Sequence, residues 1–202
     1  MLSPVRWPGW VRCFSSHSKD LKSVKALIVI DVQQGLFQAD PAPAFAAEVI
    51  ERINTLTARA RAENVPVIFV QHELASGEFL VRGSESWKVD NRLVTADTDH
   101  YVSKTTPDSF LRTDLQPLLQ QADISHLVVC GYATEFCVDT TIRRGAGLGY
   151  EITLVSDAHT TQSKAHADAA QIIAHHTATL PSIKSFGVRI QAQETAAVEF
   201  IA

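Results

Sequence analysis

The sequence contains no apolar run near the roughly 20 residues that a membrane-spanning helix needs, so we expect no membrane contact. Its three cysteines form an odd set without metal-site spacing, which indicates a reducing compartment and no disulfide framework. Basic residues are not in excess, since 18 Lys and Arg stand against 22 Asp and Glu, and this excludes a typical nucleic-acid binder. Repeats and low-complexity stretches are also missing. The remaining composition, 46% hydrophobic and 20% charged, is that of an ordinary globular domain.

Residues 1–20 differ from the rest of the chain. They carry Arg6, Arg12 and Lys19 against the single acid Asp20, together with several serines. We interpret residues 1–22 as an N-terminal extension that precedes one domain at 23–202. An untargeted tail on a cytoplasmic protein is the main hypothesis. The alternative is a mitochondrial transit peptide in residues 1–20, because the stretch 12–16, Arg-Cys-Phe-Ser-Ser, is similar to a processing site.

From residue 25 onward, short apolar runs alternate with segments of helical period. This alternation predicts an α/β fold of three αβα layers around a doubly wound, mainly parallel, six-stranded, Rossmann-like sheet with right-handed crossovers. Residues 73–98 have no sustained period and are expected to form a long loop over the crevice. The expected strands are 26–31, 66–70, 101–104, 127–130, 150–156 and 187–190, and the expected helices are 44–62, 109–121, 138–148 and 163–177.

The stretch 128–141 is the one around which the chain is organised. An apolar strand ends at Gly131, a helix can begin at Thr134 or Glu135, and Cys137 follows at once. We therefore expect Cys137 at the first turn of a helix. The free N–H groups and the helix dipole there favour a thiolate, and they could also hold an oxyanion.

Two charged residues also stand at strand ends. Asp31 follows the first strand and Lys104 closes the third, and in a parallel sheet such positions meet at one crevice. Lys104 would keep Asp31 ionised and lower the pKa of Cys137. Each residue also has a plain structural reading: a turn residue for Asp31, a surface charge for Lys104 and a small buried apolar residue for Cys137.

Three motifs in order resemble the isochorismatase-like cysteine hydrolases, a superfamily that includes nicotinamidases, carbamoylsarcosine amidohydrolase and ureide hydrolases. They are Asp31 after the first strand, Lys104 before Thr-Thr-Pro-Asp-Ser-Phe, and Gly-Tyr-Ala-Thr-Glu-Phe-Cys-Val-Asp-Thr-Thr, and the resemblance spans residues 25–187. It implies a catalytic triad of Asp31, Lys104 and Cys137. It also implies a cis peptide between Tyr132 and Ala133, with the N–H groups of Ala133 and Cys137 as the oxyanion hole.

The resemblance also bears on metal and substrate. Nicotinamidases carry a metal-binding Asp-x-His pair after the second strand, but this sequence has Val-Gln-His-Glu-Leu at 70–74. We therefore expect no metal and no cofactor, with a lone histidine there as a polar contact and His159 as a structural residue. The aromatic residues near the motifs could equally be ordinary core. The candidates for the substrate pocket are Gln33, Phe37, His72, Trp87, Tyr132 and Phe136.

The combined prediction is a hydrolase that cleaves a C–N bond of a small amide, lactam or ureide through a thioester. The runner-up is vinyl-ether hydrolysis of isochorismate, which needs no sulfur nucleophile, and a hypothesis of another class is a non-catalytic scaffold. We expect a small-molecule substrate and no nucleic-acid or membrane partner. Apolar residues of the 73–98 loop, together with the resemblance, predict a homo-oligomer, a dimer or tetramer.

Overall fold

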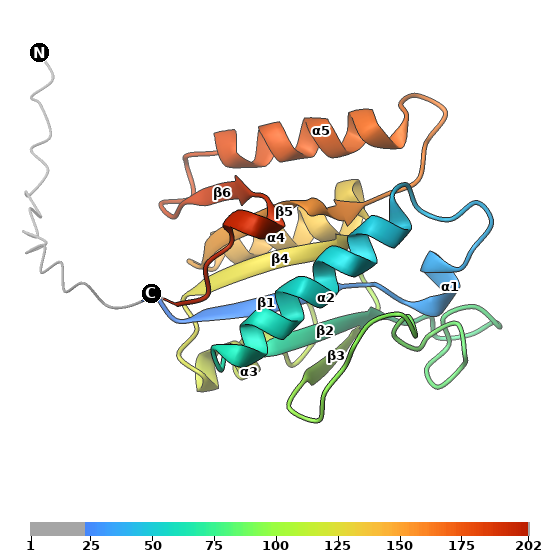
Figure 1. The fold of residues 1–202 in the computed structure, drawn as a ribbon, viewed down its shortest axis with the longest axis horizontal. Helices are drawn as coiled ribbons and strands as arrows, with labels where there is room; N and C mark the ends of the chain where they lie inside the picture. The colour runs from blue at the N-terminus through green and yellow to red at the C-terminus, as the bar shows by residue number, and fades with distance from the viewer. Residues whose placement is uncertain (1–22, 202) are drawn as a thin grey trace, which may run out of the picture.

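The structure, a computed structural model, describes residues 23–201, so the expected extension at 1–22 lies outside the described residues. Six strands form one sheet in the order β3-β2-β1-β4-β5-β6, and every neighbouring pair is parallel (Figure 1). This confirms the predicted α/β fold. The strands are β1 Lys25–Ile30, β2 Val67–His72, β3 His100–Lys104, β4 His126–Tyr132, β5 Glu151–Thr160 and β6 Ile190–Gln193.

The two central strands are apolar along almost their whole length. The five residues from Ala26 to Ile30 of β1 are 0% exposed, as are Leu127, Val129 and Cys130 of β4. Strands buried on both faces read as continuous apolar runs, which is why these two segments were visible in the sequence.

Helices cover both faces of this sheet (Figure 1). On one face, α2 presents Val49, Ile53, Leu56 and Ala60, whose helical spacing makes a single buried stripe. On the other face lie α3 and α4, and His176 of α5 approaches the α4 layer. The helices are α1 Gln34–Phe37, α2 Ala46–Ala62, α3 Leu115–Gln121, α4 Asp139–Gly147 and α5 Ala169–Thr179, with a π-helix η1 Thr134–Val138 and two 3₁₀ turns, η2 Leu180–Ser182 and η3 Thr195–Ala197.

Some element boundaries differ from the sequence expectation. Helix α5 begins at Ala169 and not at residue 163, because Asp168 and Gln171 form a capping box in which each side chain accepts the other's backbone N–H. Helix α3 starts at Leu115, six residues later than expected. Strand β5 continues to Thr160, past its expected end at 156. None of the helices in residues 23–201 is both long and apolar enough to span a bilayer.

The strand order reverses between β1 and β4, since the chain adds β2 and β3 on one side and β5 and β6 on the other. At such a switch point the loops leave the carboxyl ends of the two central strands in opposite directions, and a crevice opens between them. The residues that follow β1 and β4 therefore lie close together at this edge of the sheet.

Candidate active site

Four chemically active side chains lie at the carboxyl ends of four strands. Asp31 directly follows β1, His72 ends β2, Lys104 ends β3, and Cys137 lies in the π-helix η1 that follows β4. Asp31 has a φ of 52°, which is rare for a residue with a side chain and is typical of functional positions. The parallel sheet thus brings together residues as far apart in sequence as 31 and 137.

Lys104 is the centre of this group. Its ammonium Nζ donates to Asp31 Oδ2 over 2.7 Å and to Cys137 Sγ over 3.2 Å, and it lies 3.3 Å from His72 Nδ1. The side chains of Lys104 and Asp31 are 0% and 2% exposed, so this ion pair is removed from water. The other carboxylate oxygen, Asp31 Oδ1, is buried without a hydrogen-bond partner. A buried unpaired acceptor is unfavourable unless a ligand or reacting group meets it.

The environment of the Cys137 thiol differs from the sequence expectation. Burial and then the charge of Asp31 raise its pKa to about 12, and the opposing effect of Lys104 is smaller. Lys104 does lower the thiol pKa, as expected, but burial and Asp31 outweigh it, so the net change is a rise. Cys137 also lies in the π-helical turn before α4, not in the first turn of an α-helix. The thiol is therefore neutral beside Asp31 at physiological pH, and it would have to lose its proton to act as a nucleophile.

The turn that carries Cys137 is held by its own backbone and by a buried histidine. The peptide between Tyr132 and Ala133 is cis, and the carbonyl of Ala133 accepts the N–H groups of Phe136 and Val138. At the start of η1, Thr134 Oγ1 lies 2.8 Å from Nδ1 of His159. A π-helical turn is rare and is frequent at functional sites.

His159 in turn connects this turn to helix α5. Its Nε2 lies 3.0 Å from Thr177 Oγ1, and burial lowers the pKa of the imidazole to about 4. His159 is therefore neutral at physiological pH, with one ring nitrogen donating and the other accepting. It has a structural role, as expected, but its connection to the nucleophile turn through Thr134 was not visible in the sequence.

Gly131 lets the nucleophile strand approach the strand that leads to Asp31. It has a φ of 117°, and a Cβ built on it would lie 2.1 Å from the carbonyl oxygen of Ile30. Only glycine fits such an approach. The closeness of Asp31 and Cys137 depends on this contact between the backbones of β1 and β4.

Gln33 binds backbone groups next to the site. It is 0% exposed, its Nε2 donates to the carbonyls of His72 and Trp87, and its Oε1 accepts the N–H of His72. The Gln33 amide thus forms its hydrogen bonds with backbone groups. These bonds join the end of β2 to the long loop. This differs from its expected place in the substrate pocket.

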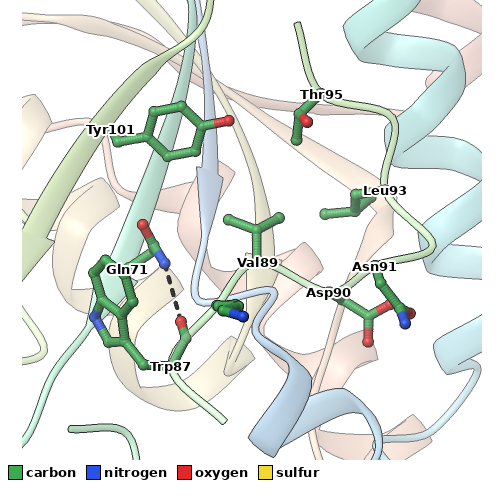
Figure 2. A pocket seen from close by; sticks show the side chains of 9 residues that line it. Gln71, Trp87, Val89, Asp90, Asn91, Leu93, Thr95 and Tyr101 are labelled. Atoms are coloured by element: carbon green, nitrogen blue, oxygen red, sulfur yellow. Dashed lines mark hydrogen bonds between the residues drawn. The ribbon is translucent and has the colours of Figure 1, made fainter. Parts of the chain in front are cut away.

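Trp87 belongs to a cavity on the other side of β2. Its carbonyl accepts a second hydrogen bond, from Gln71 Nε2 over 2.9 Å, as the dashed line in Figure 2 shows. Because neighbouring strand residues point to opposite faces, Gln71 faces away from His72 and the cluster around Lys104. The cavity has a volume of about 470 Å³ and is lined by Gln71, Trp87, Lys88, Val89, Asp90, Asn91, Leu93, Thr95 and Tyr101. The 73–98 loop is thus anchored beside the site, while its middle borders this second cavity.

The remaining pocket candidates fall into different environments. Phe37 is 1% exposed and packs edge-to-face on Tyr132, with ring centroids 6.0 Å apart, so it is core. Tyr132 is half-buried, and burial raises its pKa. Phe136 is 52% exposed and directly precedes Cys137. His72 is half-buried beside Lys104, and burial together with the Lys104 charge lowers its pKa, so it is neutral. His72 Nδ1 lies 3.3 Å from the Lys104 ammonium, which places this candidate beside Asp31, Lys104 and Cys137.

Glu135 was not predicted as part of the site. Its Oε1 accepts from Thr161 Oγ1 over 2.9 Å and pairs with Lys164 Nζ at 3.3 Å, which ties the segment after β5 to the nucleophile turn. Glu135 stands within the Cys137 motif, but its partners Thr161 and Lys164 lie 26 and 29 residues further along the chain. No local sequence pattern predicts these contacts.

Known proteins resemble this chain in sequence and structure. A family model described as "Isochorismatase domain" matches residues 25–184. Streptothricin hydrolase of Streptomyces noursei is 36% identical over 138 residues, which is 68% of this chain and 50% of that protein, so the chain spans about half the length of this curated relative. A crystal structure of an isochorismatase family protein is 35% identical, with a TM-score of 0.76 over 84% of this chain and 98% of the other. A cysteine hydrolase from Pseudomonas syringae pv. phaseolicola is 25% identical, with a TM-score of 0.78 over 86% and 89% of the two chains.

Proposed function

Because the chain belongs to the isochorismatase family, we propose that it is a cysteine hydrolase that cleaves a C–N bond of a small amide, lactam or ureide. The observation that carries the proposal is the buried Lys104 ammonium, which contacts both Asp31 Oδ2 and Cys137 Sγ. A nucleophile, an acid–base group and a fixed positive charge are the parts that covalent amide hydrolysis needs.

The first half of the reaction transfers the acyl group to sulfur. Cys137 Sγ attacks the substrate carbonyl carbon, its proton passes to Asp31, and the carbonyl π electrons move to oxygen. The N–H groups of Ala133 and Cys137 receive this oxyanion. The C–N bond then breaks as Asp31 returns the proton to the leaving nitrogen, and a thioester remains on Cys137.

The second half restores the enzyme. Asp31 removes a proton from water, the resulting hydroxide attacks the thioester carbon, and the C–S bond breaks. Asp31 then returns the proton to the sulfur. The positive charge of Lys104, 2.7 Å from Asp31 Oδ2, offsets the negative charge of the carboxylate in this buried place. The raised thiol pKa suits this cycle, because the proton needed by the leaving group is stored on sulfur at rest.

The test is turnover by the wild type and by Cys137→Ser on nicotinamide, ureides, lactams and isochorismate. We expect C–N cleavage of at least one amide-type compound, and a loss of at least about 1,000-fold in Cys137→Ser. Trapping with acid should show an acyl adduct on the Cys137 peptide by mass spectrometry.

Cys130→Ala is the matched control. Cys130 is 0% exposed within β4, and its thiol faces the Ile28 carbonyl, so removing it should leave turnover intact. An amide turned over equally well by Cys137→Ser would defeat the covalent mechanism. Isochorismate turnover that survives Cys137→Ser would favour vinyl-ether hydrolysis. A folded wild type inactive on all four classes would support a scaffold.

A further inference from the structure

Three metal-ligand side chains meet at the carboxyl edge of the sheet. The ligand atoms of Asp31, His72 and Cys137 all lie within 4.8 Å of one another, and this is the only such trio among residues 23–201. A carboxylate, a neutral imidazole and a thiolate suit a borderline-soft divalent cation such as Zn²⁺. Bonds of about 2.0–2.3 Å in a tetrahedral site separate ligand atoms by roughly 3.3–3.8 Å, so the trio would close by about 1 Å around an ion.

The Lys104 ammonium lies at the middle of this trio. Its Nζ is 2.7 Å from Asp31, 3.2 Å from Cys137 and 3.3 Å from His72. An ammonium has three N–H donors, one for each of these three acceptors. Its side chain is 0% exposed, so it cannot move easily into solvent.

We propose that Asp31, His72 and Cys137 form a latent transition-metal site whose central position is held by the Lys104 ammonium, which keeps divalent cations off the nucleophile. A second positive charge cannot enter while the first remains, because two cations about 3 Å apart repel strongly even at an effective dielectric constant of 20. Asp31 Oδ1, buried and without a partner, leaves an acceptor that a cation could use.

This role of Lys104 is separate from its part in the proposed hydrolysis. In the hydrolysis, the ammonium stabilises the Asp31 carboxylate. In the metal-excluding role, it keeps divalent cations away from the Cys137 sulfur. A bound Zn²⁺ would take the lone pair of Cys137, whose thiol proton would be released to solvent, and the sulfur would no longer attack a carbonyl. His72 takes no part in the proposed reaction but is a ligand of the proposed metal site, so a substitution at His72 tests the metal-excluding role alone.

The experiment measures metal binding without any substrate. Lys104→Ala is titrated with Co²⁺, whose bond to thiolate gives a charge-transfer band, and with Zn²⁺ by equilibrium dialysis. We expect about one ion per chain, bound at least about 100-fold more tightly than by the wild type, because the competing charge is gone. Adding His72→Ala should weaken binding by about 10-fold or more, and adding Cys137→Ser should remove the charge-transfer band.

Two further variants separate the charge of Lys104 from its size, and His72 from a histidine elsewhere in the sheet. Lys104→Gln keeps a polar side chain of similar length without the charge, and it replaces Lys104→Ala if the smaller side chain unfolds the protein. His126→Ala in the Lys104→Ala background is the matched control, because His126 is also partly buried but lies at the opposite end of the sheet. It should leave Co²⁺ binding unchanged.

The proposal is overturned if the folded Lys104 variants bind Co²⁺ no more tightly than the wild type. It is also overturned if His72→Ala and His126→Ala weaken binding equally. Because the readout involves no substrate, either result would leave the proposed hydrolase function untouched. Conversely, a failure to find an amide substrate would not change the metal-binding result.

Discussion

At Cys137, two neighbouring charges act on the thiol in opposite directions. After burial, the negative charge of Asp31 contributes most to the raised pKa, and the positive charge of Lys104 lowers it. At neutral pH the sulfur is therefore protonated, and the thiolate fraction rises as the pH approaches about 12. Without substrate, alkylation of Cys137 should increase steadily between pH 7 and pH 10 and reach no plateau in that range.

Asp31→Asn should accelerate alkylation of Cys137 while abolishing hydrolysis. The substitution removes the charge that disfavours the thiolate and leaves Lys104 free to stabilise it, so the thiol pKa falls. Each unit of lowering raises the thiolate fraction about tenfold at pH 8. The measurement is the rate of iodoacetamide labelling against pH, by mass spectrometry. Cys130, fully buried, is the internal control and should stay unlabelled. Slower labelling of Asp31→Asn would show that Asp31 does not raise the thiol pKa.

The sequence predicted which residues meet but not the state of the thiol. Asp31, Lys104 and Cys137 follow apolar runs, and parallel topology alone brings strand ends together. The thiol pKa depends on how deeply sulfur is buried and on its distance from Asp31, and both are set by packing between distant segments. For the same reason Gln33 was assigned to the pocket, although its amide binds backbone groups of two later segments.

Among the elements, the π-helix η1 depends on contacts from outside itself. His159 joins Thr134 at its start to Thr177 in α5. Replacing His159 with alanine should therefore loosen the turn that holds Cys137. We expect kcat to fall by about 10- to 100-fold with little change in KM, because the reacting geometry and not substrate binding is disturbed.

Thr177→Val is the matched control for His159→Ala. It removes only the outer hydrogen bond and keeps that between His159 and Thr134, so its effect on kcat should be several-fold smaller. The measurement is steady-state kinetics of both variants, with alkylation of Cys137 as a readout that needs no substrate. Equal losses in both variants, with KM raised, would point to general destabilisation and against a positioning role.

Strand β4 should not tolerate a side chain at Gly131. Gly131→Ala would place a Cβ against the Ile30 backbone, and we expect it to lower the free energy of unfolding by at least about 3 kcal/mol, roughly 6–12 °C in Tm. Gly149→Ala is the control, since Gly149 has a φ of 96° but no atom within 4 Å of a built Cβ. It should cost about 1–2 kcal/mol. If thermal melts show an equal loss of stability in the two variants, the positive φ, and not the close approach of β1, explains both losses.

Element boundaries were predicted less well than element types. The apolar stripe of α2 and the apolar run of β1 are long and regular, and both were found within two residues. Helix α5 was placed six residues too early, because residues 163–168 have a helical composition while the capping box at Asp168 fixes the actual start. The π-helical turn has no sequence period of its own and was read as the beginning of α4.

For the whole molecule, the exposed apolar side chains bear on association. Several large ones are exposed by 42% or more at or near the loop, among them Leu74, Phe79 and Tyr101. We predict a homo-oligomer, so that sedimentation velocity at micromolar concentration should give a mass well above the 22.1 kDa of one chain. Phe79→Ser should weaken association. Val24→Ser should not weaken association, because it alters an exposed side chain at the N-terminal end of β1, away from the loop. A fully active monomer would contradict the prediction.

The pairing of the two central strands also determines when the sheet can be completed during synthesis. In β1, Lys25 pairs with His126 of β4, 101 positions later (126 minus 25). At roughly 5–20 residues per second, a ribosome needs about 5–20 s to make that intervening stretch. During that interval the nascent β1, apolar on both faces, can pack against α2 and pair with β2, but its other edge has no partner strand. Asp31 and Cys137 cannot come together until β4 has been made and has paired with β1, so this cluster of side chains forms only late in synthesis.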